Sequence, residues 1–180
     1  MKPIVSFDMD MTLLDHKTFE IPESARRALE RLRENYIIVL ATGRDMDSHF
    51  SAGLKEKVNP DAVVHTNGTK VTVGDQIIYK SHMSQELKLR LLEFARDHDL
   101  AVGVTMGNED YYIHPERVTE FDIKRWGECG RQYVDAWKQM DMEVPSMCYI
   151  GLPEGAALIE EAFEDLRLPL FAGREGADII

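Results

Sequence analysis

Short apolar runs separated by amphipathic stretches fill the first part of the chain. The runs Ile4–Phe7, Tyr36–Leu40 and Ala62–His65 predict three buried strands of a parallel sheet. Pro22 opens a stretch whose apolar residues share one face of a helix, namely Ala25, Ala28, Leu29 and Leu32. A polar stretch of weaker helical character follows the second run. Strand, helix, strand, helix, strand is the order that builds a right-handed parallel βαβ sheet.

The pattern changes after Gly68. Alternating apolar and polar residues flank Gly74-Asp75 and again Gly107-Asn108, so each place predicts a hairpin. Apolar residues at helical spacing predict helices over Gln85–Asp97 and Glu154–Arg167. Further strands are expected at 101–106, 111–114, 147–152, 168–172 and 177–180, whereas 115–142 is polar and only partly helical.

The two patterns together predict an α/β chain with two parts. Residues 1–74 are expected to form part of a parallel, Rossmann-like core. Residues 75–180 are expected to form an α+β domain, with helices on one face of a mainly antiparallel sheet.

Composition narrows the possible partners. The chain has 180 residues, 44% of them hydrophobic, and a formal net charge of -11, which argues against nucleic acid or an anionic membrane as partner. A small phosphorylated substrate remains compatible, because one cation or helix N-terminus can reverse the local field. Two separate cysteines, no signal peptide and no apolar run of transmembrane length favour the cytoplasm. An incomplete sheet edge would favour self-association.

Two carboxylates, Asp8 and Asp10, stand directly after the first apolar run. In open α/β sheets the ligand binds at the edge formed by the carboxyl ends of the strands. One carboxylate can attack there while the other handles protons, and both can help to hold a divalent cation. The alternative is a pair that only caps the loop.

Polar residues also follow the second and third runs. Thr42-Gly43-Arg44 offers a hydroxyl, a backbone amide and a planar guanidinium, all of which suit a phosphoryl or carboxylate oxygen. Thr66-Asn67-Gly68-Thr69 ends the third run. Each segment alone can be an ordinary turn. All three strand ends, however, are expected at the same edge of the sheet.

In combination, these segments resemble the haloacid dehalogenase (HAD) superfamily of phosphatases, in its Cof-like, sugar-phosphatase-like branch with an inserted α+β (C2-type) cap. The first motif of that superfamily, DxDx(T/V), matches Asp8–Thr12, and the following Leu-Leu-Asp strengthens the match. The second motif matches Thr42 in an Ala-Thr-Gly-Arg context, and the Asn67-Gly68 turn precedes the cap insertion as it does in the branch. Met11 stands where most of the branch has glycine, so we expect altered local packing there.

The resemblance implies a Mg²⁺-dependent phosphohydrolase acting on a small phosphorylated metabolite, such as a sugar phosphate, through an aspartyl-phosphate. Asp8 would be the nucleophile, Asp10 the proton donor and acceptor, and both would contribute metal ligands. Arg44 would contact the substrate, and the domain over 75–180 would close over the site and select the substrate. Phosphoryl oxygens would be bound by Thr42 and by groups of Met9, Gly43 and Asn67.

One departure concerns the end of the sequence. In this branch the chain returns from the cap to the core and supplies a lysine and a distal acidic pair, whereas this sequence stops at Asp178-Ile179-Ile180. We therefore expect little activity from residues 1–180 alone. A non-catalytic relative that binds phosphometabolites is the main alternative. A phospho-accepting receiver domain is disfavoured, because its acceptor aspartate belongs at the third strand end, where His65-Thr66-Asn67 stands.

Overall fold

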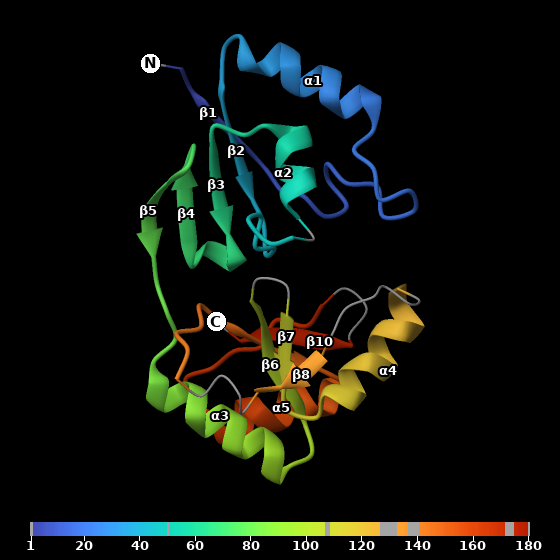
Figure 1. Ribbon diagram of the computed structural model, residues 1–180, viewed down its shortest axis with the longest axis vertical. Helices are drawn as coiled ribbons and strands as arrows, with labels where there is room; N and C mark the ends of the chain where they lie inside the picture. The colour runs from blue at the N-terminus through green and yellow to red at the C-terminus, as the bar shows by residue number, and fades with distance from the viewer. Residues whose placement is uncertain are drawn as a thin grey trace. The chain divides into compact units, whose positions relative to one another are not determined.

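The computed structural model describes residues 2–49, 51–106, 109–126, 133–136, 141–171 and 175–179. The chain divides into two compact units, Met1–Ser81 and His82–Ile180 (Figure 1). The first unit ends at Ser81 rather than at residue 74, because the hairpin after Gly68 pairs with the first sheet instead of belonging to the second unit. In the described part of the chain, no helix combines the length and apolar character needed to cross a membrane.

The first unit is built on a five-stranded sheet in the order β1-β2-β3-β4-β5. The strands β1 (Ile4–Phe7), β2 (Ile37–Ala41) and β3 (Ala62–His65) run parallel, as the apolar runs predicted. The short helical turn η1 (Thr66–Gly68) follows β3, and the predicted hairpin of β4 (Lys70–Val73) and β5 (Gln76–Lys80) adds two antiparallel strands. The helices α1 (Glu23–Arg33) and α2 (Ala52–Val58) make the two crossovers.

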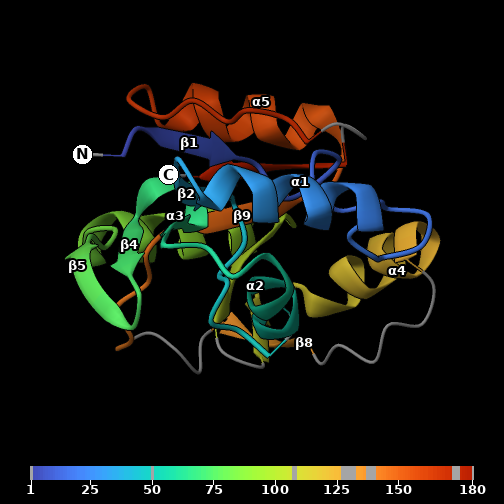
Figure 2. The same cartoon turned by 90° about the horizontal axis from the view of Figure 1, so that it is seen from above.

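One face of this sheet carries the core of the first unit. Ile38 and Leu40 are fully buried on β2, and Val63 lies on the same face of β3. These side chains pack with Leu29 of α1 and Val58 of α2, so both helices cover this face of the sheet (Figure 2). The strand order moves in one direction from β1 to β3, and two right-handed crossovers in the same direction place their helices on the same face. Ala28, expected on the apolar face of α1, is exposed instead.

The second unit is built on another five-stranded sheet, in the order β10-β9-β6-β7-β8. All neighbours are antiparallel except β7 and β8, which run parallel. Its strands are β6 (Ala101–Met106), β7 (Glu109–Tyr112), β8 (Tyr133–Asp135), β9 (Met147–Ile150) and β10 (Gly176–Ile179). Its helices are α3 (Gln85–Asp97), α4 (Pro115–Trp126) and α5 (Pro153–Ala162).

Helices cover both faces of the second sheet, whereas helices on one face were expected. Leu91 of α3, Val102 of β6 and Ile159 of α5 belong to one apolar cluster. Ala101 of β6 and Val118 of α4 belong to another. Because successive side chains of a strand point to opposite faces, α3 and α5 cover one face and α4 covers the other.

Two further details of the second unit differ from the sequence prediction. The last helix ends at Ala162 rather than Arg167, because the chain leaves the helical conformation at Phe163, whose side chain enters the core. The segment expected as a strand at 168–172 makes a single bridge, Leu170 to Ala177. The predicted turn at Gly107-Asn108 lies outside the described residues.

Gly103 is a position where the second unit has no room for a side chain. A Cβ atom there would lie 2.0 Å from the carbonyl oxygen of Tyr111. We therefore expect Gly103→Ala to lower the free energy of unfolding by about 3 kcal/mol, because the neighbouring backbone must move. Gly53→Ala is the matched control, since nothing lies within 4 Å of that position in α2, and it should be neutral or stabilising. Urea unfolding measures both, and equal effects would contradict the packing.

Candidate functional site

A pocket of about 330 Å³ opens where β1, β2 and β3 end. Its lining residues come from all three strand ends: Asp8, Ala41, Thr42, Gly43, Val64, Asn67 and Gly68. Parallel pairing explains the position, because it brings the carboxyl ends of neighbouring strands to one edge of the sheet. Four of the residues proposed from the sequence therefore lie around one cavity, whereas Asp10, Arg44 and Met9 are absent from its lining.

The chain turns sharply after β1. The carbonyl oxygen of Met9 accepts hydrogen bonds from the amides of Thr12, Leu13 and Leu14, and the Met9 side chain is fully buried. Asp8, just before this turn, is exposed at the pocket. Met11 has a φ of 59° and a side chain that is 78% exposed. Glycine suits such a conformation better, because a left-handed residue with a Cβ costs about 1–2 kcal/mol.

Backbone hydrogen bonds join the ends of β2 and β3. The amide of Thr66 donates to the carbonyl of Arg44 at 3.1 Å, and the amide of Asn67 donates to the carbonyl of Thr42 at 3.3 Å. Gly43 lies between them, and a Cβ on it would come within 2.8 Å of the Asn67 Oδ1 atom. The two strand ends therefore form one connected wall of the pocket, and Gly43 permits their close approach.

The turn after β3 has an uncommon backbone. Thr66, Asn67 and Gly68 have φ values of 45°, 54° and 93°. Positive φ is a marked outlier for a β-branched threonine. Thr69 stabilises the turn, because its hydroxyl donates to the Thr66 carbonyl at 2.8 Å and its amide also bonds that carbonyl. Backbone strain of this kind, about 1–3 kcal/mol per residue, often accompanies functional sites.

Asp10 is held beside the pocket by two partners. Arg44 binds it with a planar fork, Nε to Oδ2 at 2.7 Å and Nη2 to Oδ1 at 2.6 Å. His16 donates from Nε2 to Oδ1 at 2.8 Å. Partial burial alone would raise the pKa of Asp10, but hydrogen bonds and positive charge from Arg44, and then from His16, outweigh it and lower the pKa below its ordinary value. Asp10 is therefore ionised and fully engaged.

The sequence pattern did not identify His16. The structure places it in a tight loop, where the Phe19 amide donates to the Asp15 carbonyl at 2.8 Å and Asp15 pairs with Glu20. Its ring stacks on Phe19 with 5.9 Å between centroids. The position in the loop, six residues after Asp10, carries no periodic signal that could have revealed the contact.

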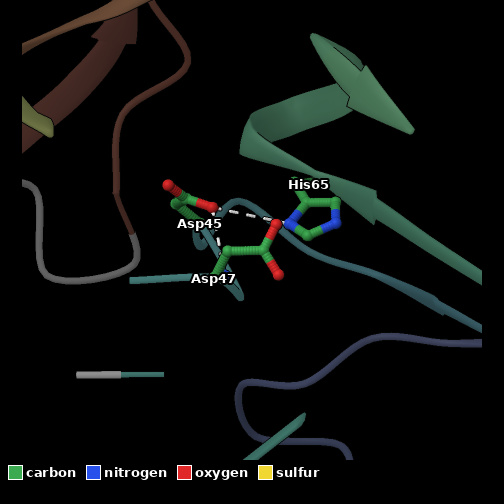
Figure 3. Close-up of side chains that lie close together, drawn as sticks. All are labelled: Asp45, Asp47 and His65. Atoms are coloured by element: carbon green, nitrogen blue, oxygen red, sulfur yellow. Dashed lines mark hydrogen bonds and ion pairs between the residues drawn. The ribbon is translucent and has the colours of Figure 1, made fainter. Parts of the chain in front are cut away.

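A second polar cluster joins the loop after β2 to the end of β3. Asp45, Asp47 and His65 each offer a ligand atom, and these atoms lie within 4.8 Å of one another (Figure 3). His65 is fully buried, its Nδ1 accepts the Met46 amide at 3.2 Å, and its Nε2 bonds the Thr72 hydroxyl at 2.9 Å. Sequence reasoning missed this group, because it joins the end of β3 to a loop twenty residues earlier.

Cations of the protein already neutralise this cluster. Lys55 and Lys70 each bring Nζ to 2.6 Å from an oxygen of Asp47, and Lys70 also lies 3.5 Å from Asp45. The set of two carboxylates and an imidazole can bind a divalent ion of the transition series. Magnesium prefers oxygen ligands, so the exposed Asp8 carboxylate suits it better than this mixed set does. The cluster therefore acts first as a support for the loop after Arg44.

Comparison with known proteins gives concordant results. The family model of the haloacid dehalogenase-like hydrolases matches residues 5–168. An uncharacterized hydrolase of Schizosaccharomyces pombe is 26% identical over 136 residues, 72% of this chain and 44% of its own. YkrA of Bacillus subtilis, provisionally named as a phosphatase, is 30% identical over 93 residues, 51% of this chain and 35% of its own. The chain thus spans less than half the length of these curated relatives.

Solved structures resemble the whole described fold. A phosphatase of the HAD superfamily from Bacteroides thetaiotaomicron superposes with a TM-score of 0.81 at 22% identity, over 99% of this chain and 66% of that one. At such low identity the likeness establishes the fold alone.

The Asp45 carboxylate gives the site region a specific pH dependence. The pKa of Asp45 is lowered from 3.8 to about 2 by its contact with His65, whose Nδ1 lies 3.5 Å from Oδ1 and whose effect outweighs partial burial, and by the Asp47 amide and Lys70. Ionised Asp45 thus adds up to about 2 kcal/mol of stability above pH 4, and this is lost as the pH falls from about 4 to about 2. Asp45→Asn should remove that part of the dependence.

Urea unfolding between about pH 2 and pH 5 measures the difference between the wild-type protein and the variant. Asp75→Asn, in the exposed turn between β4 and β5, is the matched control, because it makes the same chemical change outside the cluster. A gap between wild type and Asp45→Asn that stays constant across this range would show that the cluster does not favour the ionised carboxylate.

Proposed function

Since the chain belongs to the haloacid dehalogenase-like hydrolases, we propose that it carries the nucleophile of a phosphatase site acting on a small phosphorylated metabolite. The observation that supports this most strongly is the pocket at the carboxyl ends of β1, β2 and β3, with the exposed Asp8 on its lining. Asp8 has no bonded partner among the described residues, so its carboxylate can reach a phosphorus atom in the pocket without first leaving one of them.

In the proposed reaction, an oxygen of Asp8 attacks phosphorus and the ester oxygen of the substrate leaves with a proton. The product of this step is an acyl phosphate on Asp8, which water then hydrolyses to free phosphate. Asp10 is the proposed proton donor and acceptor for the two steps. Because Asp10 is ionised and bound by Arg44 and His16, it must leave Arg44 and take up a proton from solvent before it can protonate the leaving oxygen.

The proposed phosphoryl contacts come from the three strand ends. The Thr42 hydroxyl accepts the Arg44 amide at 3.2 Å, so it can still donate its own hydrogen into the pocket. Gly43 and Asn67 border the same space, and the backbone amide of Met9 follows Asp8 directly. Fixed donors of this type favour the charge that develops on a transferring phosphoryl group, because they need no reorganisation.

The donor set at Asp8 fits magnesium by its chemistry. The Asp8 carboxylate and the Asp10 backbone carbonyl are hard oxygen ligands, whereas the Asp10 carboxylate is already bound by Arg44 and His16. Magnesium bound there would offset the negative charge of the carboxylate and of the phosphoryl oxygens. The pocket itself offers one carboxylate and no basic side chain among its described lining residues, so such compensation is needed.

Sugar phosphates are the substrate class that we propose. A solved HAD subclass IIB sugar phosphatase superposes with a TM-score of 0.80 over 99% of this chain, at 21% identity. We propose that the second unit acts as the cap that selects the substrate, because the first unit alone supplies the phosphoryl pocket.

A non-catalytic protein that binds phosphometabolites is the second candidate. The observation in its favour is the Asp10 carboxylate, which is engaged beside the pocket rather than lining it. The two candidates differ in chemistry at Asp8, because only the phosphatase forms a covalent bond there.

Aryl phosphate hydrolysis with Mg²⁺ separates the candidates. Attack by Asp8 on p-nitrophenyl phosphate should release a burst of nitrophenolate, up to one equivalent per protein, even where the second step is slow. Asp8→Asn should abolish the burst and leave the fold intact, as judged by circular dichroism. Asp75→Asn, the same change in an exposed turn, should behave as the wild type.

A burst that persists in Asp8→Asn would rule out the proposed nucleophile. Calorimetric binding of phosphate esters by the wild type, without any burst, would instead support the non-catalytic candidate.

A further inference from the structure

The described residues that line the pocket include no cation. Among its described lining residues, Asp8 is the single charged side chain, and the sequence as a whole is strongly acidic. A phosphate entering this space meets a like charge. Arg44 directly follows the lining residue Gly43 in the sequence, but its guanidinium is bound to Asp10.

In its contact with Arg44, the Asp10 carboxylate can be replaced by a phosphate. The guanidinium makes two parallel hydrogen bonds to the carboxylate, at 2.7 Å and 2.6 Å. The same planar fork matches two oxygens of a phosphate. Both side chains are partly exposed, 27% for Arg44 and 33% for Asp10, so an anion from solvent can reach the pair.

The backbone of Arg44 is fixed while its side chain can change partners. Its amide bonds the Thr42 hydroxyl and its carbonyl accepts the Thr66 amide, both within the pocket wall. A guanidinium that leaves Asp10 therefore stays anchored beside the pocket. An exchange of partners at this residue would be a rotation of its side chain on a backbone that the strand ends hold.

For Asp10 to release Arg44, its carboxylate must keep another hydrogen-bond donor, and His16 is that donor. It donates to the same Oδ1 atom of Asp10 that Arg44 Nη2 contacts. Asp10 therefore keeps a hydrogen-bond donor when Arg44 leaves, and a partly buried carboxylate is not left without one. The stacking of His16 on Phe19 holds the imidazole in place.

We propose that the Arg44 guanidinium is the anion receptor of this site. In the ligand-free protein the Asp10 carboxylate occupies Arg44. A substrate phosphate or carboxylate displaces Asp10 from Arg44, and His16 keeps its hydrogen bond to the displaced Asp10. This inference rests on the proposed function, because it takes the pocket to bind phosphorylated molecules. It adds that Asp10 becomes available to the substrate only when an anion has engaged Arg44. His16 is then a positioning residue for Asp10, and Arg44 favours substrates with an anionic group within its reach.

Calorimetric titration with inorganic phosphate at pH 7, without Mg²⁺ and at constant ionic strength, tests the exchange. Asp10→Asn removes the competitor of the phosphate, so it should tighten binding by roughly tenfold in the presence of Arg44. In the R44Q background the same substitution should give only the small gain that follows from removing one negative charge. Asp8→Asn is the matched control, because it removes a charge at the pocket that Arg44 does not bind, and its gain should be equal in both backgrounds.

The outcomes separate the exchange from the proposed function. If wild-type protein binds phosphate and Asp10→Asn gives the same gain in both backgrounds, the exchange is wrong while the phosphate site stands. If no variant binds phosphate without Mg²⁺, the exchange is wrong, and if none binds it with Mg²⁺ either, the proposed function is wrong as well. Thermal unfolding of each variant confirms that it is folded, and the isosteric change at Asp10 preserves the shape of the side chain.

Variants of His16 test the positioning role. His16→Ala should weaken phosphate binding several-fold, because displaced Asp10 then lacks a donor, and His16→Gln should restore binding, because its amide can donate from a similar position. The effect of His16→Ala should vanish in the D10N background. A loss of affinity that persists there would show that His16 acts on the fold rather than through Asp10.

Discussion

Parallel pairing of β1, β2 and β3 is the constraint on which the candidate site depends. It brings three strand ends, separated by dozens of residues in the sequence, to one edge of a sheet. The pairing is secured by apolar side chains on the covered face, such as Ile38 and Leu40. Hydrogen bonds between the Thr42–Arg44 segment and the turn at Thr66 then fix the shape of the wall.

Charged side chains at this edge of the sheet fall into three groups. Asp8 lines the pocket, Arg44 and Asp10 neutralise each other beside it, and Asp45 pairs with Lys70 in the loop that follows Arg44. Each of these contacts lowers the cost of holding carboxylates close together in an acidic protein. Among the described residues, the same arrangement leaves the pocket lining without a cation, and Arg44 beside it is held by Asp10.

Sequence reasoning succeeded where one local pattern decides the structure. Three apolar runs predicted the parallel strands. Of the residues named in the motifs after them, Asp8, Thr42, Gly43 and Asn67 line the pocket. Sequence reasoning failed where a side chain has several possible partners. Rotamers and loop paths, which no local pattern encodes, decide three such contacts: Arg44 with Asp10, His16 with Asp10, and the group around His65. Sequence reasoning also missed the second helical layer of the second unit, because α4 lies in a polar stretch without a clear period.

The central claim is that the three strand ends form one anion site with Asp8 as its reacting group. A crystal structure of the protein with orthovanadate and Mg²⁺ tests it most directly. The claim predicts vanadium next to the Asp8 carboxylate, with vanadate oxygens bonded to the Thr42 hydroxyl and the backbone around Asn67. Vanadate bound at the cluster of Asp45, Asp47 and His65, or absent from the pocket at saturating concentration, would contradict it.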